Sequence, residues 1–210
     1  MKTISLFPFL QSSIEGDRCG AIDKLRDFNM ADKRPISQLG DPVLRQTARP
    51  ISNVQDDWVQ PLIDDLILTL IQSQGVGISA PQVGSPHRIV VMASHPNERY
   101  PDAPMMEPTV LINPRMIDHS EACVTDWEGC LSIPNIRGRV PRYQAVEVEY
   151  TTPAGKLQRQ VFTDFIARIF QHEFDHLEGM VFLDRLQQPQ ELMTEQEYRQ
   201  RVLTPVLAGR

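Results

Sequence analysis

The clearest hydrophobic pattern in the chain is helical and covers residues 57–74. Its apolar positions recur every three or four residues, at Val59, Leu62, Ile63, Leu66, Leu70 and Ile71. Pro61 lies in the first turn and Gly75 follows the end, which is the usual placement of these residues around a helix. The glycines of the next stretch, Gly75 to Gly84, allow close backbone approaches, so we expect a loop that lines a site.

Shorter apolar runs predict β-strands. They cover residues 87–93, 109–113, 145–151 and 156–162. The last two runs flank Pro153-Ala-Gly155, which predicts a hairpin. A proline-rich loop, expected to be mobile, separates the first two at residues 94–108.

A second helix is predicted from about Thr163 to Glu178, with Thr163 or Asp164 as its cap and Gly179 closing it. Its apolar stripe continues through two histidines and consists of Phe165, Ile169, His172 and His176. Strands together with two helices, one of them central, indicate an α+β fold.

Three regions are expected along the chain. Its 210 residues are enough for one substantial core, which we assign to residues 34–186. Residues 1–33 are predicted to be a loosely ordered N-terminal extension, with Met30 as an alternative start. Residues 187–210 are predicted to be a helical C-terminal tail with a solvated, mixed-charge surface.

Composition narrows the classes of function. The formal charge of −6 argues against a nucleic-acid-binding surface, and no apolar run reaches the roughly 18–20 residues of a membrane span. The first residues resemble neither a secretory signal nor an acid-poor transit peptide. An odd number of cysteines, three, favours a reducing compartment, and we expect a cytoplasmic protein.

The second helix carries the sequence His-Glu-Phe-Asp-His, an H-E-x-x-H pattern. Residues four apart lie one above the other on a helix, so His172 and His176 can bind one metal ion. Glu173 is close enough to reach a water molecule on that ion. Cys130, within Glu128-Gly-Cys-Leu-Ser132, is the candidate third ligand, and Gly129 is expected to let the chain pass close to the ion.

Plainer interpretations stay open for the same residues. The histidine pair alone could be polar surface, and a lone cysteine is more often a small buried hydrophobe. Cys123 lies in a polar run and is expected to play no part. If a metal binds, it can activate water for attack on a carbonyl, Glu173 can move the proton, and Gln82 with the backbone N–H of Leu131 can stabilise the oxyanion.

Three segments together resemble the peptide deformylases. They are the glycine loop Gly75 to Gln82, the strand Glu128 to Ser132 and the helix segment Gln171 to His176, in family order. The similarity extends from about Pro35 to Leu186. One departure is Ser79, where the family usually has alanine, and its hydroxyl should need only a local hydrogen-bond partner.

The resemblance implies mostly antiparallel sheets around a central helix and removal of the formyl group from N-formylmethionyl nascent peptides. It implies that Cys130, His172 and His176 ligate the metal while metal-bound water attacks the formyl carbonyl. Glu173 would be the general acid/base, with Gln82 and Leu131 at the oxyanion. The family typically uses Fe²⁺, and Zn²⁺, Ni²⁺ or Co²⁺ can occupy the site; ligand softness alone favours zinc.

By motif position, the methionine pocket would involve Val76, Phe165 and Ile169, with backbone contacts from Gly77. Phe165 and Ile169 could equally be ordinary core residues. Glu128 is expected to pair with Arg142, and Asp175 either to orient a ligand or to face water. The expected partners are formylated peptides emerging from the ribosome, without direct nucleic-acid or membrane binding, and the expected state is a monomer or weak dimer.

Two other functions compete with deformylation. The helix pattern alone would also suit a general zinc endopeptidase, which commonly takes its third ligand from a downstream histidine or glutamate. A metal-binding module without catalysis is the other alternative, and it would show four protein ligands and no open position.

Overall fold

The computed structural model describes residues 31–97 and 100–204, and all the elements below belong to residues 32–210. The expectations for residues 1–30, a loose extension and an alternative start at Met30, lie outside the described residues. In the described ranges, no helix combines the length and apolar character that a membrane span needs.

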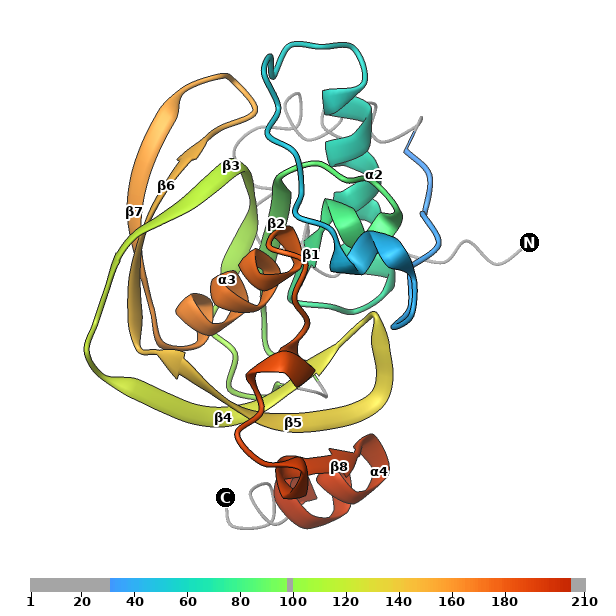
Figure 1. Cartoon of the computed structure of the whole chain (residues 1–210), viewed down its shortest axis with the longest axis vertical. Coiled ribbons are helices and arrows are strands. Elements are labelled where there is room, and N and C mark those ends of the chain that lie inside the picture. Colours follow the sequence, from blue (N-terminus) through green and yellow to red (C-terminus); the bar gives the residue numbers. More distant parts are fainter. Residues whose placement is uncertain (1–30, 98–99, 205–210) are drawn as a thin grey trace, which may run out of the picture. The chain divides into compact units, whose positions relative to one another are not determined.

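Two antiparallel sheets and one long central helix form the frame of the fold (Figure 1). The first sheet has the strand order β1-β2-β3-β6-β7, and the second has the order β4-β5-β8. The strands are β1 (Gly77–Ser79), β2 (Ile89–Ser94), β3 (Met106–His119), β4 (Cys123–Cys130), β5 (Ile133–Tyr143), β6 (Ala145–Thr151), β7 (Leu157–Thr163) and β8 (Leu192–Thr194). The predicted α+β class and its antiparallel sheets are confirmed.

Two main helices, α2 (Val59–Gln72) and α3 (Asp164–Leu177), match the two helical patterns. Short 3-10 helices occur at η3 (Pro42–Arg45), η4 (Ala80–Val83), η5 (Phe182–Arg185) and η6 (Pro189–Glu191). The chain then forms α4 (Glu195–Tyr198) and the π-helical η7 (Arg199–Leu203). The tail predicted to be helical therefore also contains a short strand, β8, which follows η6 and pairs with β5.

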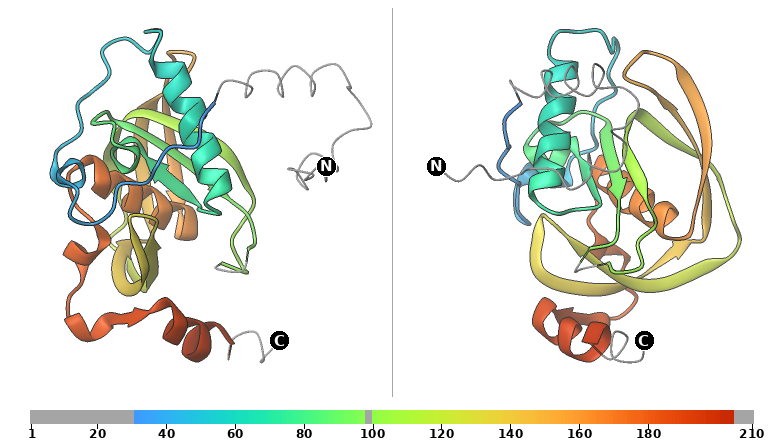
Figure 2. Two further views of the ribbon diagram at one scale, coloured as in Figure 1. Left: turned by 90° about the vertical axis from the view of Figure 1, so that its right-hand side faces the viewer. Right: turned by 180° about the vertical axis from the view of Figure 1, so that it is seen from behind.

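Strand β2 is buried on both faces of the five-stranded sheet because its apolar side chains alternate between them. Ile89 and Val91 pack with α2, whereas Val90 and Met92 pack with α3. Figure 2 shows the two helices on opposite sides of this sheet. Burying a side chain of this size stabilises the fold by about 1.5–3 kcal/mol. The core thus fixes α3 between the sheets, with its polar residues toward the second one.

The strand predicted at residues 109–113 proved to be part of a much longer one, β3, and the predicted loop before it is shorter. Pro108 and Pro114 lie inside β3, at two of the three places where its pairing register with β2 or β6 shifts. A proline cannot donate to a sheet ladder, but it fits at such irregularities. The prolines therefore bend the strand instead of ending it.

Candidate active site

Helix α3 brings His172 and His176 inward, as their spacing predicted. Their exposed fractions are 8% and 0%, and their ring centroids are 5.3 Å apart. From the second sheet, Cys130 at the end of β4 points its sulfur to within 3.2 Å of His176 Nε2. One ligand atom from each of these three residues lies within 4.8 Å of the others. Cys130 and His176 therefore meet although they are 46 positions apart in the chain.

The donor atoms of this cluster suit a divalent metal ion. Burial alone would raise the pKa of Cys130, but the neighbouring His176 and His172 outweigh it and hold that pKa well below its usual range. A thiolate with two imidazoles is a donor set that soft or borderline divalent metals accept, and three protein ligands leave room for a further one. These residues fit a catalytic divalent ion.

Glu128 orients the His172 ring through the ring nitrogen that faces away from the ligand cluster. Its Oε2 atom accepts a hydrogen bond from His172 Nδ1 at 2.8 Å, so the other ring nitrogen faces the cluster. The same carboxylate accepts from Arg142 Nε at 2.9 Å and from Arg168 at 2.9 Å. Burial would raise the pKa of Glu128, but Arg142 and His172 bring it well below its usual range, so the carboxylate stays charged.

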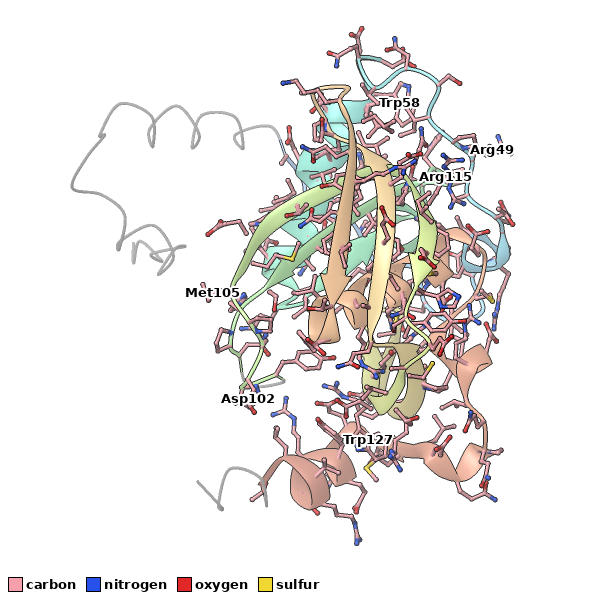
Figure 3. The ribbon with its side chains drawn as sticks, turned by 90° about the vertical axis from the view of Figure 1, so that its left-hand side faces the viewer. Arg49, Trp58, Asp102, Met105, Arg115 and Trp127 are labelled. Atoms are coloured by element: carbon pink, nitrogen blue, oxygen red, sulfur yellow. The ribbon has the colours of Figure 1, made fainter. Side chains whose placement is uncertain are left out.

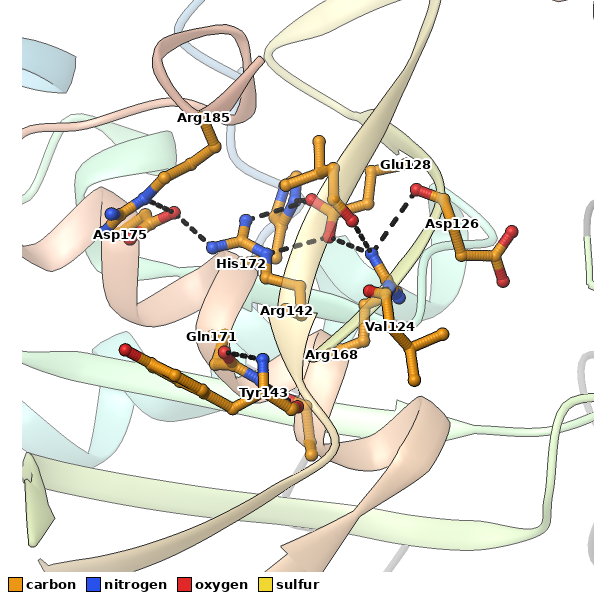
Figure 4. Close-up of polar contacts among 12 residues, drawn as sticks. Val124, Asp126, Glu128, Arg142, Tyr143, Arg168, Gln171, His172, Asp175 and Arg185 are labelled. Atoms are coloured by element: carbon orange, nitrogen blue, oxygen red, sulfur yellow. Dashed lines mark hydrogen bonds and ion pairs between the residues drawn. The ribbon is translucent and has the colours of Figure 1, made fainter. Parts of the chain in front are cut away.

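Asp175 extends this network to the helix itself (Figure 4). Arg142 donates to Asp175 Oδ2 at 2.6 Å, and Arg185 donates to its Oδ1 at 2.6 Å. The expected pairing of Glu128 with Arg142 is confirmed. Asp175 is only 2% exposed, so it does not face water, and it acts on the site through Arg142.

Glu128→Gln is expected to weaken metal binding about 10- to 100-fold, the usual cost of losing a group that orients a metal-binding histidine. The amide keeps the size of the side chain but removes the charge that Arg142, Arg168 and His172 share. Competition against a coloured chelator measures the affinity. Glu147→Gln, on β6 and away from the pocket, is the control, and equal affinity in both variants would contradict the role of Glu128.

Glu173 lies beside the cluster with an unusual environment. It is 4% exposed, and its Oε2 atom has no hydrogen-bond partner among the described residues. Burial raises the pKa of this carboxyl to about 7, although His172 and His176 act in the opposite direction. A carboxyl of this kind can accept or donate a proton near neutral pH.

Gly77 provides the space for Glu173. A Cβ atom at this position would stand 2.6 Å from Glu173 Oε1 and 2.9 Å from Ile169 Cγ2. Any side chain would displace the carboxylate, so the glycine loop predicted to line a site does so directly. Gly77 was expected to offer backbone contacts to substrate; its closest packing contact, beyond its chain neighbours, is with Glu173.

Gln82 is held with its amide donors toward Cys130. The backbone N–H of Ser79 donates to Gln82 Oε1 at 2.8 Å, and the Ser79 hydroxyl donates to the same atom at 3.0 Å. Gln82 Nε2 consequently points to Cys130 Sγ at 3.5 Å and to Ser132 Oγ at 3.3 Å. The hydroxyl of Ser79, expected to need a local partner, finds it in Gln82.

A pocket opens above these groups. Its lining includes Gln82, Cys130, Leu131, His172 and Glu173, together with the four residues expected to bind methionine, Val76, Gly77, Phe165 and Ile169. Ile169 is also part of the core and Phe165 packs against it, so both are core residues as well as lining residues, and their contact with methionine stays a prediction. The candidate residues therefore surround one pocket, with His176 completing the ligand cluster at its base.

Tyr100, Trp127 and Arg168 also line the pocket, and the sequence pattern did not indicate them. Trp127 comes directly before Glu128 in β4, and this neighbour in the sequence could have indicated that it lies at the site. Tyr100 comes from the loop between β2 and β3, where no motif indicates a place at the site. Gly129 lines the pocket beside Cys130, and its expected role in letting the chain pass close to an ion stays a prediction. The structure adds a second neighbour, because a Cβ atom at Gly129 would stand 3.0 Å from Arg137 Nε.

A buried helix that presents H-E-x-x-H to a pocket, with a free carboxylate beside the metal ligands, is the arrangement of a metal-dependent hydrolase. The sequence model of one such family, polypeptide deformylase, matches residues 33–192. The chain belongs to the polypeptide deformylase family. It is an enzyme that removes the N-formyl group from nascent peptides in a metal-dependent reaction.

Relatives and solved structures agree with this assignment. Peptide deformylase 2 of Nostoc sp. is 56% identical over 168 residues, covering 80% of this chain and 94% of the relative. The Met-Ala-Ser bound class I type b peptide deformylase of Acinetobacter baumannii matches with a TM-score of 0.73 and 40% identity, over 74% of this chain and 99% of that one. Peptide deformylase from Thermotoga maritima matches with a TM-score of 0.67 and 33% identity, over 75% and 99% of the two chains. The predicted family resemblance is confirmed.

Proposed function

We propose that Cys130, His172 and His176 hold one divalent ion and that Glu173 is the general acid/base of formylmethionine deformylation. The observation that carries this assignment is the position of the Glu173 carboxylate, buried and without a partner among the described residues, next to the three converging ligand atoms. A carboxylate would be costly to bury there without a role for it. It is therefore free to exchange a proton with a substrate.

Substrate binding follows from the lining of the pocket. The methionine side chain packs against Val76, Phe165 and Ile169, while the Gly77 backbone runs alongside the substrate. This placement brings the formyl carbon to the metal cluster and to Glu173. The Acinetobacter baumannii relative was crystallised with Met-Ala-Ser bound, a peptide that begins with the same residue.

The chain's own groups then handle the charge and the protons. When bound, a divalent ion supplies Lewis-acid activation of water and of the formyl carbonyl. Glu173 accepts a proton from the attacking water and passes it to the leaving amine, so water and the formamide yield formate and a free amino terminus. Gln82 Nε2 and the Leu131 backbone N–H donate to the oxygen on which negative charge develops.

The ion in the cell is proposed to be Fe²⁺. One thiolate and two imidazoles suit Zn²⁺, Ni²⁺ or Co²⁺ as well, so these ions should also occupy the site in preparations. The proposed setting is the cytoplasm, with peptides leaving the ribosome as substrates and the enzyme acting as a monomer or weak dimer. The negative net charge gives no support to direct binding of ribosomal RNA.

The test uses protein purified and assayed without oxygen and loaded with Fe²⁺. Formyl-Met-Ala-Ser should release formate and a free amino terminus in equal amounts, and casein should remain uncut. Absence of formate with a full complement of metal would contradict the proposal. Cleavage of casein would instead favour the general endopeptidase.

A further inference from the structure

Arg137 is a buried arginine outside the metal cluster. It lies on β5 with 0% exposure and has the largest fully buried side chain among the described residues. In the register of the second sheet it stands opposite Gly129, and its guanidinium group fills the space beside that glycine. Arg137 therefore faces the residue that comes directly before Cys130 in β4.

Its partners come from two distant parts of the chain. Glu195, the first residue of α4, accepts from Arg137 Nε at 2.5 Å and from a terminal nitrogen at 3.2 Å. The Tyr100 hydroxyl, in the loop between β2 and β3, accepts from the other terminal nitrogen at 3.0 Å. The guanidinium carbon also lies 5.2 Å from the Tyr100 ring centroid and 4.8 Å from that of Tyr198.

The contacts of Arg137 hold several side chains in place at once. Burial would lower the pKa of Arg137, but Tyr100 and Glu195 raise it above its usual value, so the guanidinium remains charged. A buried charge is strongly destabilising when one of its partners is removed. The arginine should thus hold Glu195, Tyr198 and Tyr100 in defined positions.

The positions of these side chains matter because they line the pocket or contact residues that line it. Tyr100 lines the pocket and lies 5.1 Å, between ring centroids, from Phe165 of the methionine site. Tyr198 lies 5.6 Å from the ring of Trp127, which also lines the pocket. Figure 3 shows Trp127 near the C-terminal segment, which is made of β8, α4 and η7. Asp102, from the loop that carries Tyr100, lies toward the same segment.

Tyr100 and Trp127 are half-buried, whereas the metal cluster and Ile169 are buried. A peptide whose formyl group reaches Glu173 and whose methionine contacts Ile169 must leave the pocket past its half-buried lining. The half-buried lining residues are Val76, Tyr100, Trp127, Gly129, Leu131 and Phe165. Val76 and Phe165 are assigned to methionine and Leu131 to the oxyanion, which leaves the two aromatic rings for the peptide beyond. The two aromatic rings are therefore placed to contact the residues that follow methionine. Aromatic side chains offer large contact areas at low conformational cost.

We propose that Arg137 is a positioning residue that, with Glu195 and Tyr198, holds Tyr100 and Trp127 as the walls for the peptide beyond its methionine. The C-terminal segment thereby determines the affinity for longer substrates without touching the reacting atoms. This proposal rests on the proposed deformylation. It assigns to residues 195–198 a role in substrate selection.

Glu195→Gln tests this proposal because it removes the charge but keeps the side-chain size. KM for formyl-Met-Ala-Ser should rise about tenfold or more, as expected when a distant change displaces binding groups by an ångström or less. The kcat value, the metal content, and kcat/KM for formyl-methionine without further residues should stay unchanged. Glu195→Asp keeps the carboxylate and should recover part of the affinity.

Glu197→Gln is the matched control. Glu197 lies in the same short helix and pairs with Arg201, away from Arg137, so its kinetics should equal those of the unchanged protein. Tyr198→Leu is a second variant that leaves the ion pair in place, and it should also raise KM for the tripeptide. It keeps the test open if Glu195→Gln does not fold.

Three results would overturn the proposal. They are an unchanged tripeptide KM in both variants that fold, an equal loss for formyl-methionine alone, and a fall in kcat that follows loss of metal. Failure of the proposed function is distinguishable, because the unchanged protein itself would then release no formate.

Discussion

Glu173→Gln should lower kcat for formate release by about 10²- to 10⁴-fold, the range that a positioned general acid/base contributes. The variant keeps the size of a side chain that is 4% exposed and packed against Gly77, so the fold should be preserved. The neutral amide can neither accept the proton of the attacking water nor return one to the leaving amine. Formate release at saturating formyl-Met-Ala-Ser measures the loss.

The control for this variant is Glu178→Gln at the end of α3. Glu178 pairs with Arg88, outside the pocket, and its replacement should leave kcat and metal content unchanged. Metal content of Glu173→Gln should also equal that of the unchanged protein. If kcat of Glu173→Gln stayed within about tenfold of normal, far less than a general base contributes, another group would have to move the proton.

Cys130→Ala should lower metal affinity by more than about 100-fold. Losing a direct ligand costs more than losing a group that only hydrogen-bonds to a ligand. Formate release should fall in proportion to the metal lost. Cys130 is 4% exposed, and its sulfur contacts His176 Nε2 and Gln82 Nε2, so the change also removes one contact of Gln82. Metal analysis after dialysis against a chelator measures this effect.

Cys123→Ala provides the comparison within the same strand. Cys123 is exposed at the start of β4, and its loss should change neither metal content nor rate. This pair of variants also separates the deformylase from a general endopeptidase. Full metal content in Cys130→Ala would mean that the third ligand lies elsewhere.

The features that the sequence predicted depend on local spacing. Helix α3 and the β6–β7 hairpin were located because apolar periodicity and turn residues act over a few positions. The approach of His172 and His176 to each other followed from helix geometry alone. Cys130 was already the candidate third ligand from its own segment, but only the resemblance of three segments to a known family favoured that role over a plain buried cysteine.

Other features depend on contacts that no local pattern encodes. Tyr100 and Glu195 reach Arg137 across 37 and 58 residues of chain. The packing of Arg137 against Gly129 was not predicted for the same reason, since Arg137 comes from the facing strand. Strand β8 has only three residues and exists because β5 offers an edge for pairing, not because of its own apolar pattern.

The carboxylates of Glu128 and Asp175, with Arg142 between them, tie β4, β5 and α3 together through the protein's own contacts. Small zinc-dependent domains instead need their ion in order to fold. Because these contacts join the ligand-bearing elements without the help of an ion, we expect the apoprotein to remain folded and to exchange one ion for another without refolding. We then expect supply and exchange rates in its surroundings to decide which metal the enzyme carries, and one folded population to be recharged after its metal is lost.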